Sequence, residues 1–360
     1  MGPRRVTGGT GLRSSVRAAV LAAAAGTAVA CGGDAAPPDA APSTTPPAVT
    51  SGSAADGQDR LSGELWVNPE GHGAVALAEA RAAGDDAAAE ELEPLAGQPA
   101  ATWFANPGNP YPAVHEVSVA AAEAGEIPVL VAYYVPLRDC RSYSAGGAAD
   151  TDEYLSWIGS FAAAIEDRPA IVVLEPDAIP QAIVGCEGLD PAERYQVLGQ
   201  AVEILARQPG ARIYLDAGNA SWIEELPALA DALRASNIDQ ADGFALNVSN
   251  FESTEASASY GLALSQQLAA TAPPGTPPVH FVIDTSRNGA GPPPATAVGE
   301  DRWCNPEGRR LGAPPTTSPD LPRVDALLWI KQPGDSDGTC RGGPIAGQWW
   351  PEAAEELVGG

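Results

Sequence analysis

Carboxylates that follow apolar runs are the residues of this chain whose type and spacing suit chemistry. Asp139, Asp177, Asp216 and Asp337 each come after a stretch rich in β-branched residues. A single Asp in that position is usually a helix cap or a turn residue, but four in one repeated pattern favour a shared site. Carboxylates that converge with few cations suit either a hard cation bound by oxygen ligands or acid–base chemistry on a sugar.

Lys331 and several aromatic side chains accompany these carboxylates. Lys331 is the single lysine of the chain, which otherwise uses arginine, so we expect a compact ammonium charge to be needed there. Trp222, Trp303 and Trp329 lie in or beside the same loops, and Tyr133 lies at a strand end. Indole rings at strand ends offer apolar platforms for sugar rings. Core packing is the alternative, above all for Trp329 inside an apolar run.

The elements that must position these residues alternate between strand and helix. Residues 152–166 place apolar side chains at helical spacing, and Asp190-Pro191 opens a second helix that stops at Gly210. This alternation predicts an α/β barrel with its site at the C-terminal strand ends. Continuous apolar runs predict parallel strands buried on both faces, at 128–135, 170–174, 212–215, 243–246, 280–283 and 326–330.

Composition excludes several classes of protein. The 360 residues include 46 acidic and 20 basic side chains, a net charge of −26 that argues against a nucleic-acid partner. At 44% hydrophobic residues the chain can bury a core. The three histidines are far apart and no Cys-x-x-Cys spacing occurs, so no His/Cys metal site is expected.

The first 60 residues are typical of an export signal and a linker. Residues 1–30 join a basic head to a short run of small apolar residues, which predicts a secretion signal too short to span a membrane. Cys31, between Ala-Val-Ala and Gly-Gly, is similar to a lipobox cysteine, so we expect lipidation there and anchoring to the outer face of the cell membrane. Ordinary cleavage and secretion is the alternative. Residues 31–60, rich in Pro, Ser, Thr and Ala, predict a linker before the domain at 61–360.

The remaining cysteines fit an exported protein. They are Cys140, Cys186, Cys304 and Cys340, an even number that predicts two disulfides with three pairings open. Pairing each cysteine with its neighbour in the chain would close loops worth about 3–4 kcal/mol each. Four buried thiols are the alternative.

Seven segments, in this order along the chain, resemble glycoside hydrolase family 6, the inverting cellulases that act on β-1,4-glucan. They are VAYYVPLRDCRSYSAGG (131–147), IVVLEPDA (171–178), YLDAGNASWI (214–223), GFALNVSNF (243–251), FVIDTSRNGAGP (281–292), WCNPEGRRLG (303–312) and LWIKQPGDSDGTC (328–340). The resemblance implies a distorted barrel of seven parallel strands with a cleft across the strand ends. It also implies disulfides between Cys140 and Cys186 and between Cys304 and Cys340, and a reaction without metal or other cofactor.

The resemblance implies a role for each carboxylate. Asp177 is similar to the general acid, Asp139 to the partner that raises the pKa of the acid and arranges the attacking water, and Asp337 to the base. Inversion needs one protonated and one ionised carboxyl group with room for a water between them. The residues implied to bind β-1,4-glucan or cello-oligosaccharide are Tyr133, Asp216, Trp222, Asn250, Trp303, Trp329, Lys331 and Asp335.

Several positions depart from the family pattern, so substrate preference is less fixed than reaction type. The segments after Asp177 and Gly289 are compact and leave little length for loops that would roof a tunnel, so we expect endo action. An exo-acting cellobiohydrolase is the alternative within the family, and a two-lobed, non-catalytic sugar-binding lipoprotein is the alternative outside it. The departures are Tyr134 and Leu137 where Asn is usual, Asn219 where His is usual, and Asp335 where Glu is usual.

Overall fold

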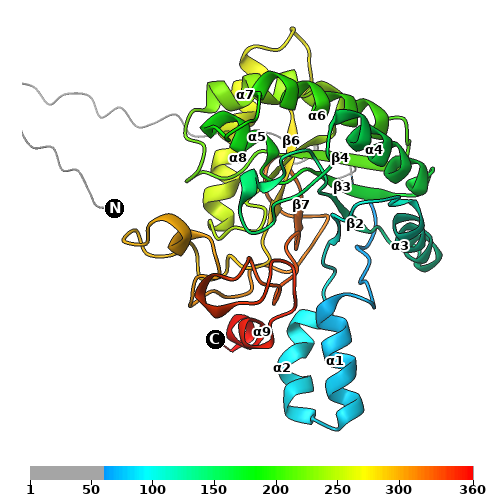
Figure 1. The fold of residues 1–360 in the computed structure, drawn as a ribbon, viewed down its shortest axis with the longest axis vertical. Helices are drawn as coiled ribbons and strands as arrows, with labels where there is room; N and C mark the ends of the chain where they lie inside the picture. The colour runs from blue at the N-terminus through cyan, green and yellow to red at the C-terminus, as the bar shows by residue number, and fades with distance from the viewer. Residues whose placement is uncertain (1–60, 360) are drawn as a thin grey trace, which may run out of the picture. The chain divides into compact units, whose positions relative to one another are not determined.

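The computed structural model describes residues 61–359 (Figure 1). The expected secretion signal, lipidation at Cys31 and linker lie outside these residues. Seven parallel strands form one sheet, ordered as they occur in the chain. They are β1 (Thr102–Phe104), β2 (Val129–Ala132), β3 (Ala170–Leu174), β4 (Ala211–Asp216), β5 (Gly243–Leu246), β6 (His280–Asp284) and β7 (Val324–Leu328).

The sheet curls until its first and last strands meet. The amide of Ala101, just before β1, donates to the carbonyl of Trp329, just after β7, at 2.9 Å. The indole N–H of Trp103 donates to the carbonyl of Ile330 at 2.7 Å across the same seam. These contacts give a distorted seven-stranded parallel barrel, which confirms the predicted fold class. Residues 61–359 thus form one barrel and not the two lobes expected for the sugar-binding lipoprotein alternative.

Helices cover the outside of the barrel (Figure 1). Asp190 accepts the amide of Ala192 and begins α6, as predicted, and Asp150 accepts the amide of Glu153 and begins α4 in the same way. No helix among residues 61–359 is both long and apolar enough to cross a bilayer. The helices between the strands are α3 (Tyr111–Ala124), α4 (Thr151–Ile165), α5 (Ala178–Val184), α6 (Pro191–Leu205), α7 (Leu226–Ala235) and α8 (Thr254–Ala270).

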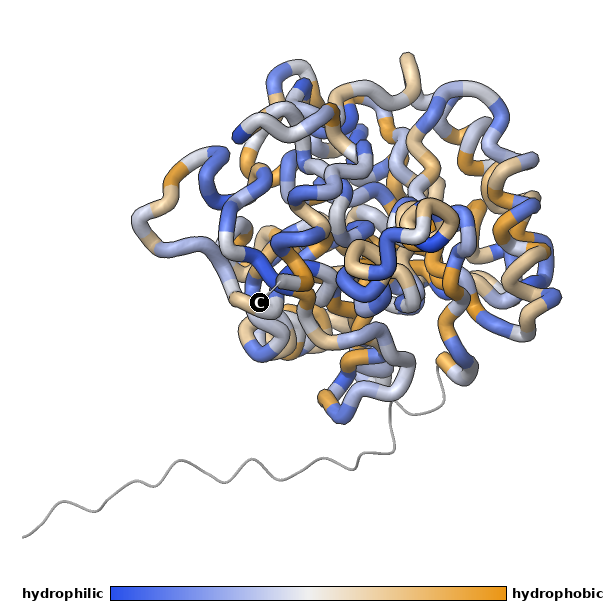
Figure 2. Tube along the Cα trace, turned by 90° about the horizontal axis from the view of Figure 1, so that it is seen from below, coloured by the Kyte–Doolittle hydropathy of each residue, from blue (hydrophilic) through white to orange (hydrophobic). Residues whose placement is uncertain are grey.

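Apolar side chains fill both faces of the sheet. Every residue of β2, β3, β5, β6 and β7 is buried, as continuous apolar strands predict. One cluster packs between the strands and the helices, and a smaller one fills the barrel interior. Figure 2 shows hydrophobic and hydrophilic stretches alternating along the outer helices, as expected for helices with one face on the core.

Two further parts frame the carboxyl ends of the strands. Helices α1 (His72–Ala83) and α2 (Asp86–Ala96) form a hairpin before β1, and α2 contacts α9 (Pro351–Val358). Neither this hairpin nor the three-residue β1 has a counterpart in the sequence prediction. Short 3-10 turns lie in the loops after three strands, at η1 (Asp139–Arg141), η3 (Gly299–Arg302) and η4 (Cys340–Gly342), and a fourth, η2 (Ile238–Gln240), lies between α7 and β5.

Candidate active site

A cavity of about 1040 Å³ opens at the carboxyl ends of the strands. It gathers all the sugar-binding and catalytic residues predicted from the sequence except Asp216 and Trp329. The predicted residues that line it are Tyr133, Asp139, Asp177, Trp222, Asn250, Trp303, Lys331, Asp335 and Asp337.

Asp177 stands at the turn between β3 and α5 among other carboxylates. Its backbone adopts a left-handed conformation with φ of 70° as the N-cap of α5. Its amide donates to Oδ2 of Asp216 at 2.8 Å, which brings the two residues together. Burial, and then the charges of Asp216 and Asp139, raise the pKa of the Asp177 carboxyl well above its usual range. Asp177 therefore carries a proton where most aspartates have lost theirs.

Asp216, at the end of β4, lies beneath Asp177 and does not line the cavity. It is 1% exposed, and its Oδ2 also accepts the amide of Gly218 at 3.3 Å. Burial raises its pKa, and the charge of Asp284 adds to this rise. Asp216 thus lies behind the cavity wall, where it accepts the amide of Asp177 and its charge acts on that residue.

Asp139 enters the cavity from the loop after β2. Its Oδ2 accepts the amide of Ser144 at 2.6 Å, and its Oδ1 accepts the side-chain amide of Gln181 at 3.4 Å. Burial raises the pKa of Asp139, and these hydrogen bonds and the charge of Arg138 offset part of the rise. The disulfide between Cys140 and its partner on the segment after α5 ties the Asp139 loop to the helix that Asp177 caps.

Glu175 joins the loops of Asp139 and Asp177, a function that the sequence reading missed. It is 1% exposed, and its carboxylate accepts the amides of Tyr134 at 2.9 Å and Val135 at 3.0 Å. Burial raises its pKa to about 7. Its place two residues before Asp177, directly after an apolar strand, was the available signal.

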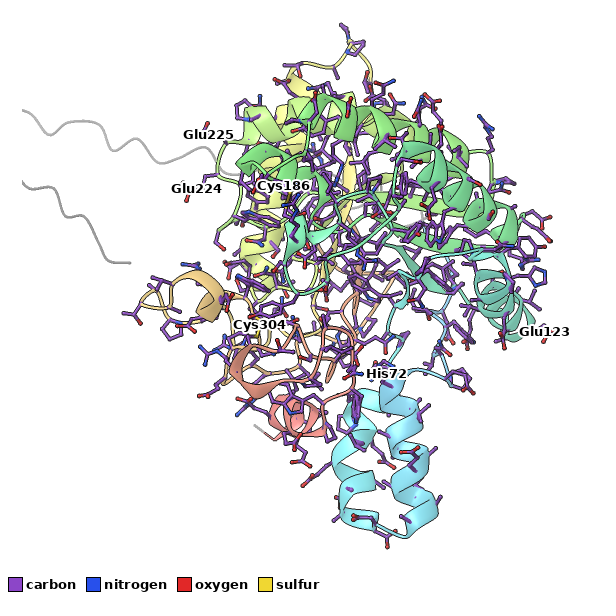
Figure 3. All side chains as sticks on the ribbon, viewed as in Figure 1. His72, Glu123, Cys186, Glu224, Glu225 and Cys304 are labelled. Carbon is purple, nitrogen blue, oxygen red and sulfur yellow. A yellow bond between two sulfur atoms is a disulfide. The ribbon has the colours of Figure 1, made fainter. Side chains whose placement is uncertain are left out.

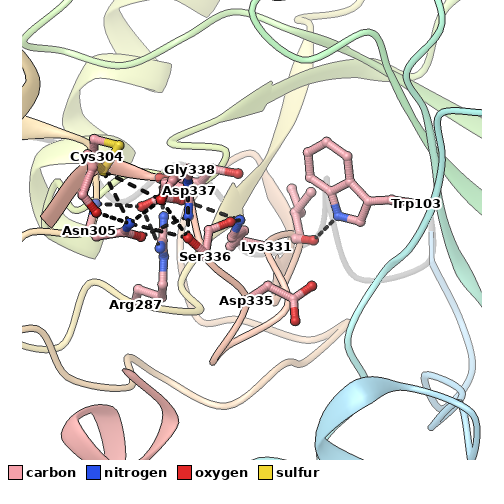
Figure 4. A network of polar contacts seen from close by, with 12 residues as sticks. Trp103, Arg287, Cys304, Asn305, Lys331, Asp335, Ser336, Asp337 and Gly338 are labelled. Atoms are coloured by element: carbon pink, nitrogen blue, oxygen red, sulfur yellow. Dashed lines mark hydrogen bonds and ion pairs between the residues drawn. A yellow bond between two sulfur atoms is a disulfide. The ribbon is translucent and has the colours of Figure 1, made fainter. Parts of the chain in front are cut away.

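Asp337 lies in the opposite electrostatic setting (Figure 4). Its carboxylate contacts Nη1 of Arg287 at 3.0 Å and Nζ of Lys331 at 3.3 Å, and it accepts the amide of Asn305 at 3.0 Å. Burial alone would raise its pKa, but the two cations and the hydrogen bonds from Arg287 and Asn305 outweigh burial and lower it. Asp337 is therefore ionised.

The two cations around Asp337 are themselves fixed. Lys331 donates to the carbonyl of Ser336 at 3.0 Å, which holds its ammonium group beside Asp337. Arg287, in the loop after β6, donates to the carbonyl of Ser249 at 2.6 Å and lies over the ring of Phe251. Its place soon after β6 was a signal that the sequence reading did not use.

The predicted disulfides both form. Cys140 pairs with Cys186, and Cys304 pairs with Cys340. Cys186 and Cys304, one from each pair, lie in different parts of the fold (Figure 3). The second bond joins the loop that carries Asn305 to the loop that carries Asp337, so each carboxylate cluster has its own cross-link.

Asp335 marks one end of the cavity together with the helical hairpin. Nδ1 of His72, the first residue of α1, lies 2.7 Å from Oδ1 of Asp335. The hydrogen bond that His72 donates to Asp335 raises the pKa of His72, although partial burial and the charge of Lys331 act against the rise. The hairpin therefore contributes a polar side chain to the cavity wall.

Aromatic rings line the cavity, and they differ from the predicted set at one position: Trp103 lines the cavity and Trp329 does not. Trp329 is 2% exposed and its indole N–H donates to the carbonyl of Ala313 at 3.0 Å, so the core-packing alternative describes it correctly. Trp103, which the sequence reading missed, lines the cavity instead and meets Tyr133 edge to face at 5.3 Å. It lies on β1, which is too short to carry a pattern.

Among residues 61–359, no three His, Cys, Asp or Glu side chains are arranged to hold a metal ion. Two carboxyl groups of the cavity have pKa values shifted in opposite directions, raised for Asp177 and lowered for Asp337. A pair of carboxyl groups whose environments push their pKa values apart is the arrangement that acid–base chemistry requires.

Comparison with known proteins identifies relatives of this site and fold. Endoglucanase A of Cellulomonas fimi is 43% identical over 270 residues, which are 74% of this chain and 55% of that protein. Endoglucanase 1 of Streptomyces sp. (strain KSM-9) is 40% identical over 282 residues, 77% of this chain and 74% of that protein. The chain thus spans about half the length of the first relative and about three quarters of the second.

A solved structure and a family model agree with these relatives. An endoglucanase from Mycobacterium tuberculosis, in complex with methyl-cellobiosyl-4-deoxy-4-thio-β-D-cellobioside, superimposes with a TM-score of 0.74 at 39% identity. The match covers 82% of this chain and 97% of that one. The model described as glycosyl hydrolases family 6 matches residues 61–360. The chain belongs to glycosyl hydrolases family 6.

Proposed function

We propose that this protein is an endoglucanase that hydrolyses β-1,4-glucosidic bonds with inversion at the anomeric carbon. One observation carries the proposal: a single cavity holds Asp177, whose pKa is raised, and Asp337, whose pKa is lowered. An inverting glycosidase needs one carboxyl group that gives a proton and another that is already ionised.

The proposed reaction assigns one step to each carboxyl group. Asp177 gives its proton to the glycosidic oxygen as the bond from that oxygen to C1 breaks. A water attacks C1 from the opposite face with Asp139 helping to orient it, and its proton passes to Asp337 directly or through other waters. The product is the α-anomer, and both carboxyl groups then return to their starting states by exchange with solvent.

The cations around Asp337 set when the water loses its proton. Arg287 and Lys331 keep Asp337 ionised, but they also make its carboxylate a weak proton acceptor. Proton transfer to it becomes favourable only after the bond from water to C1 has largely formed. A transition state that resembles an oxocarbenium ion tolerates this order, because its C1 accepts a weak nucleophile.

The cavity lining suits a glucan chain. Trp103, Trp222 and Trp303 offer aromatic faces for the apolar sides of glucose rings. Lys331 and Asp335 offer charged groups for its hydroxyls. The endoglucanase names of the relatives at 40–43% identity support endo action over release of cellobiose from chain ends.

We also propose that the protein works outside the cell, secreted or anchored through a lipid on Cys31. The two disulfides fit an oxidising compartment. Mass spectrometry of the mature N-terminus tests the anchor. A diacylated Cys31 and loss of membrane association in Cys31→Ser support it, whereas an unmodified N-terminus contradicts it.

Proton NMR on cellohexaose tests the reaction itself. The native protein is expected to release the α-anomer first, and Asp177→Ala is expected to lose nearly all turnover while remaining folded by circular dichroism. Early β-anomer would contradict inversion, and binding without turnover would favour the sugar-binding alternative. A rapid fall in the viscosity of hydroxyethylcellulose per reducing end formed distinguishes endo from exo action.

A further inference from the structure

Tyr143 is a cavity residue that the reaction above does not use. It follows Asp139 by four residues in the loop after β2 and lines the cavity. Its hydroxyl donates to Oε2 of Glu300 at 3.2 Å. Its ring centroid lies 6.0 Å from that of Trp303 with the planes tilted by 57°. One side chain from the loop after β2 thus meets two residues of the loop after β6.

The same ring also touches a third loop. A Cβ built on Gly338 would lie 2.3 Å from Cγ of Tyr143 and 2.6 Å from its Cβ, so the ring packs directly on the Gly338 backbone. Gly338 follows Asp337, and its φ of +153° is a conformation that side chains rarely adopt. Tyr143 therefore joins the loop of Asp139, the loop of Asp337 and the loop of Trp303.

The strand order places these loops on opposite sides of the barrel. Strand β6 is separated from β2 by β7 and β1 in one direction and by β3, β4 and β5 in the other. No two strands of a seven-stranded ring lie further apart. Residues line the cavity on both sides of a line drawn from the end of β2 to the end of β6. Trp103 and Gln332 lie toward the seam, and Trp222 and Asn250 lie toward β4 and β5. The contact of Tyr143 with Glu300 and Trp303 thus crosses the cavity.

We propose that Tyr143 is a specificity-determining residue: with Glu300 and Trp303 it bridges the cavity and favours glucan chains that carry no bulky substituents. The inference rests on the proposed function and extends it to the substrate class. A bare chain passes the bridge with its ring faces against aromatic side chains. Groups attached to its hydroxyls project sideways and meet the bridge. A hydrogen bond and a ring contact can open, so internal stretches of a chain still enter.

The test compares two neutral substrates, so that the net negative charge of the protein does not enter. The value of kcat/KM is measured on cellohexaose and on hydroxyethylcellulose for the native protein, Tyr143→Ala, Tyr143→Phe and Glu300→Gln. The expected result for Tyr143→Ala is a rise of about tenfold in the ratio of hydroxyethylcellulose to cellohexaose. Tyr143→Phe, which removes the hydrogen bond and keeps the ring, is expected to raise it about threefold. Glu300→Gln, whose amide oxygen still accepts a weaker, uncharged hydrogen bond, is expected to raise it by less.

Tyr111→Ala is the matched control. Tyr111 begins α3 outside the barrel, stacks on His115 and does not line the cavity. Its loss is expected to leave the substrate ratio unchanged. Thermal unfolding of every variant checks that the barrel is intact, and the two conservative variants decide the question if Tyr143→Ala unfolds.

Three results would overturn the inference. An unchanged ratio in all bridge variants would mean that the contact does not restrict the substrate. An equal loss of kcat on both substrates would mean that Tyr143 only positions the loops of Asp139 and Asp337. A native protein that cleaves neither substrate would overturn the proposed function itself, an outcome that activity on cellohexaose alone separates from the other two.

Discussion

Each side of the cavity holds a buried aspartate, and the surroundings shift the pKa values of the two in opposite directions. On one side, Asp177 lies near Asp139 and above Asp216, and its pKa is raised. On the other side, Asp337 contacts Arg287 and Lys331, and its pKa is lowered. Burial acts against the charged form at both sites. The neighbours therefore decide which carboxyl group keeps its proton.

The comparison also shows how the backbone takes part. The amide of Asp177 is directed at Asp216, so the turn that presents the acid also places a second carboxylate beneath it. The amide of Asn305 is directed at Asp337, so the backbone there stabilises the anion. Acid and base are thus distinguished by local chain geometry as well as by side-chain charge.

The largest effect is expected from removal of the acid. Asp177→Asn should lower kcat/KM on cellohexaose by about 10³–10⁴-fold, because the leaving oxygen then departs without a proton. A cellobioside with a 2,4-dinitrophenyl leaving group, which needs no proton, should lose far less activity in the same variant. Equal losses on both substrates would show that Asp177 does not act as the acid.

A smaller effect is expected from removal of a neighbouring charge on the acid side. Asp177 must be protonated, so activity is present below its pKa and is lost as pH rises through it. Asp139→Asn removes a charge that raises this pKa and should move the alkaline limb of the kcat/KM profile down by about one unit. Gln181→Ala, which removes only a hydrogen bond to Asp139, is the control and should leave that limb nearly in place.

The base side offers the converse test. Asp337 must be ionised, so activity is lost as pH falls through its pKa, which Lys331 helps to lower. Lys331→Met should raise the acid limb of the profile by about one unit. Lys331→Arg keeps the charge and should hold the acid limb while changing KM. If the acid limb of the profile lies at the same pH in the native protein and in Lys331→Met, Asp337 is not the base.

The smallest effect is expected at the partly exposed His72, whose pKa is raised from 6.5 chiefly by its hydrogen bond to Asp335. A raised pKa stabilises the folded protein below the unfolded value, and this contribution disappears as pH rises through the folded value. Because the His72 side chain is 45% exposed, we expect less than about 1 kcal/mol. Denaturant titrations of native protein and His72→Gln should differ at pH 5 and converge at pH 9.

The sequence predicted most of the strands and the main carboxylates of the cavity, but it did not predict β1, the helical hairpin or the position of Trp329. The apolar runs that end in an acidic or amide residue predicted six of the strands and the convergence of Asp139, Asp177 and Asp337, because a parallel barrel brings all its carboxyl strand ends to one face. Strand β1 was not predicted, because three residues are too few to show a periodic pattern. The helical hairpin was not predicted, because its many alanines give little contrast between an apolar and a polar face. Trp329 was misplaced because sequence does not tell which way a residue just past a strand end points.

Charge partners were the least predictable part. The resemblance pointed to Asp337, and the place of Arg287 soon after β6 was a signal, but the sequence does not show that these two side chains, fifty residues apart, meet. Contacts between distant loops depend on the closed barrel, and local spacing does not encode them. The same holds for Glu175, whose bonds to Tyr134 and Val135 cross from one strand end to the next.

Each of the two disulfides cross-links the loops on one side of the active site. Cys140–Cys186 stiffens the acid side and Cys304–Cys340 stiffens the base side, so neither covalent bond crosses the gap between Asp177 and Asp337. Each half resists the small shifts that would alter its own electrostatics. Across the opening, Tyr143 makes non-covalent contacts with Glu300 and Trp303. Covalent cross-links thus fix the loops on each side of the cavity, while a hydrogen bond and a ring contact join the two sides.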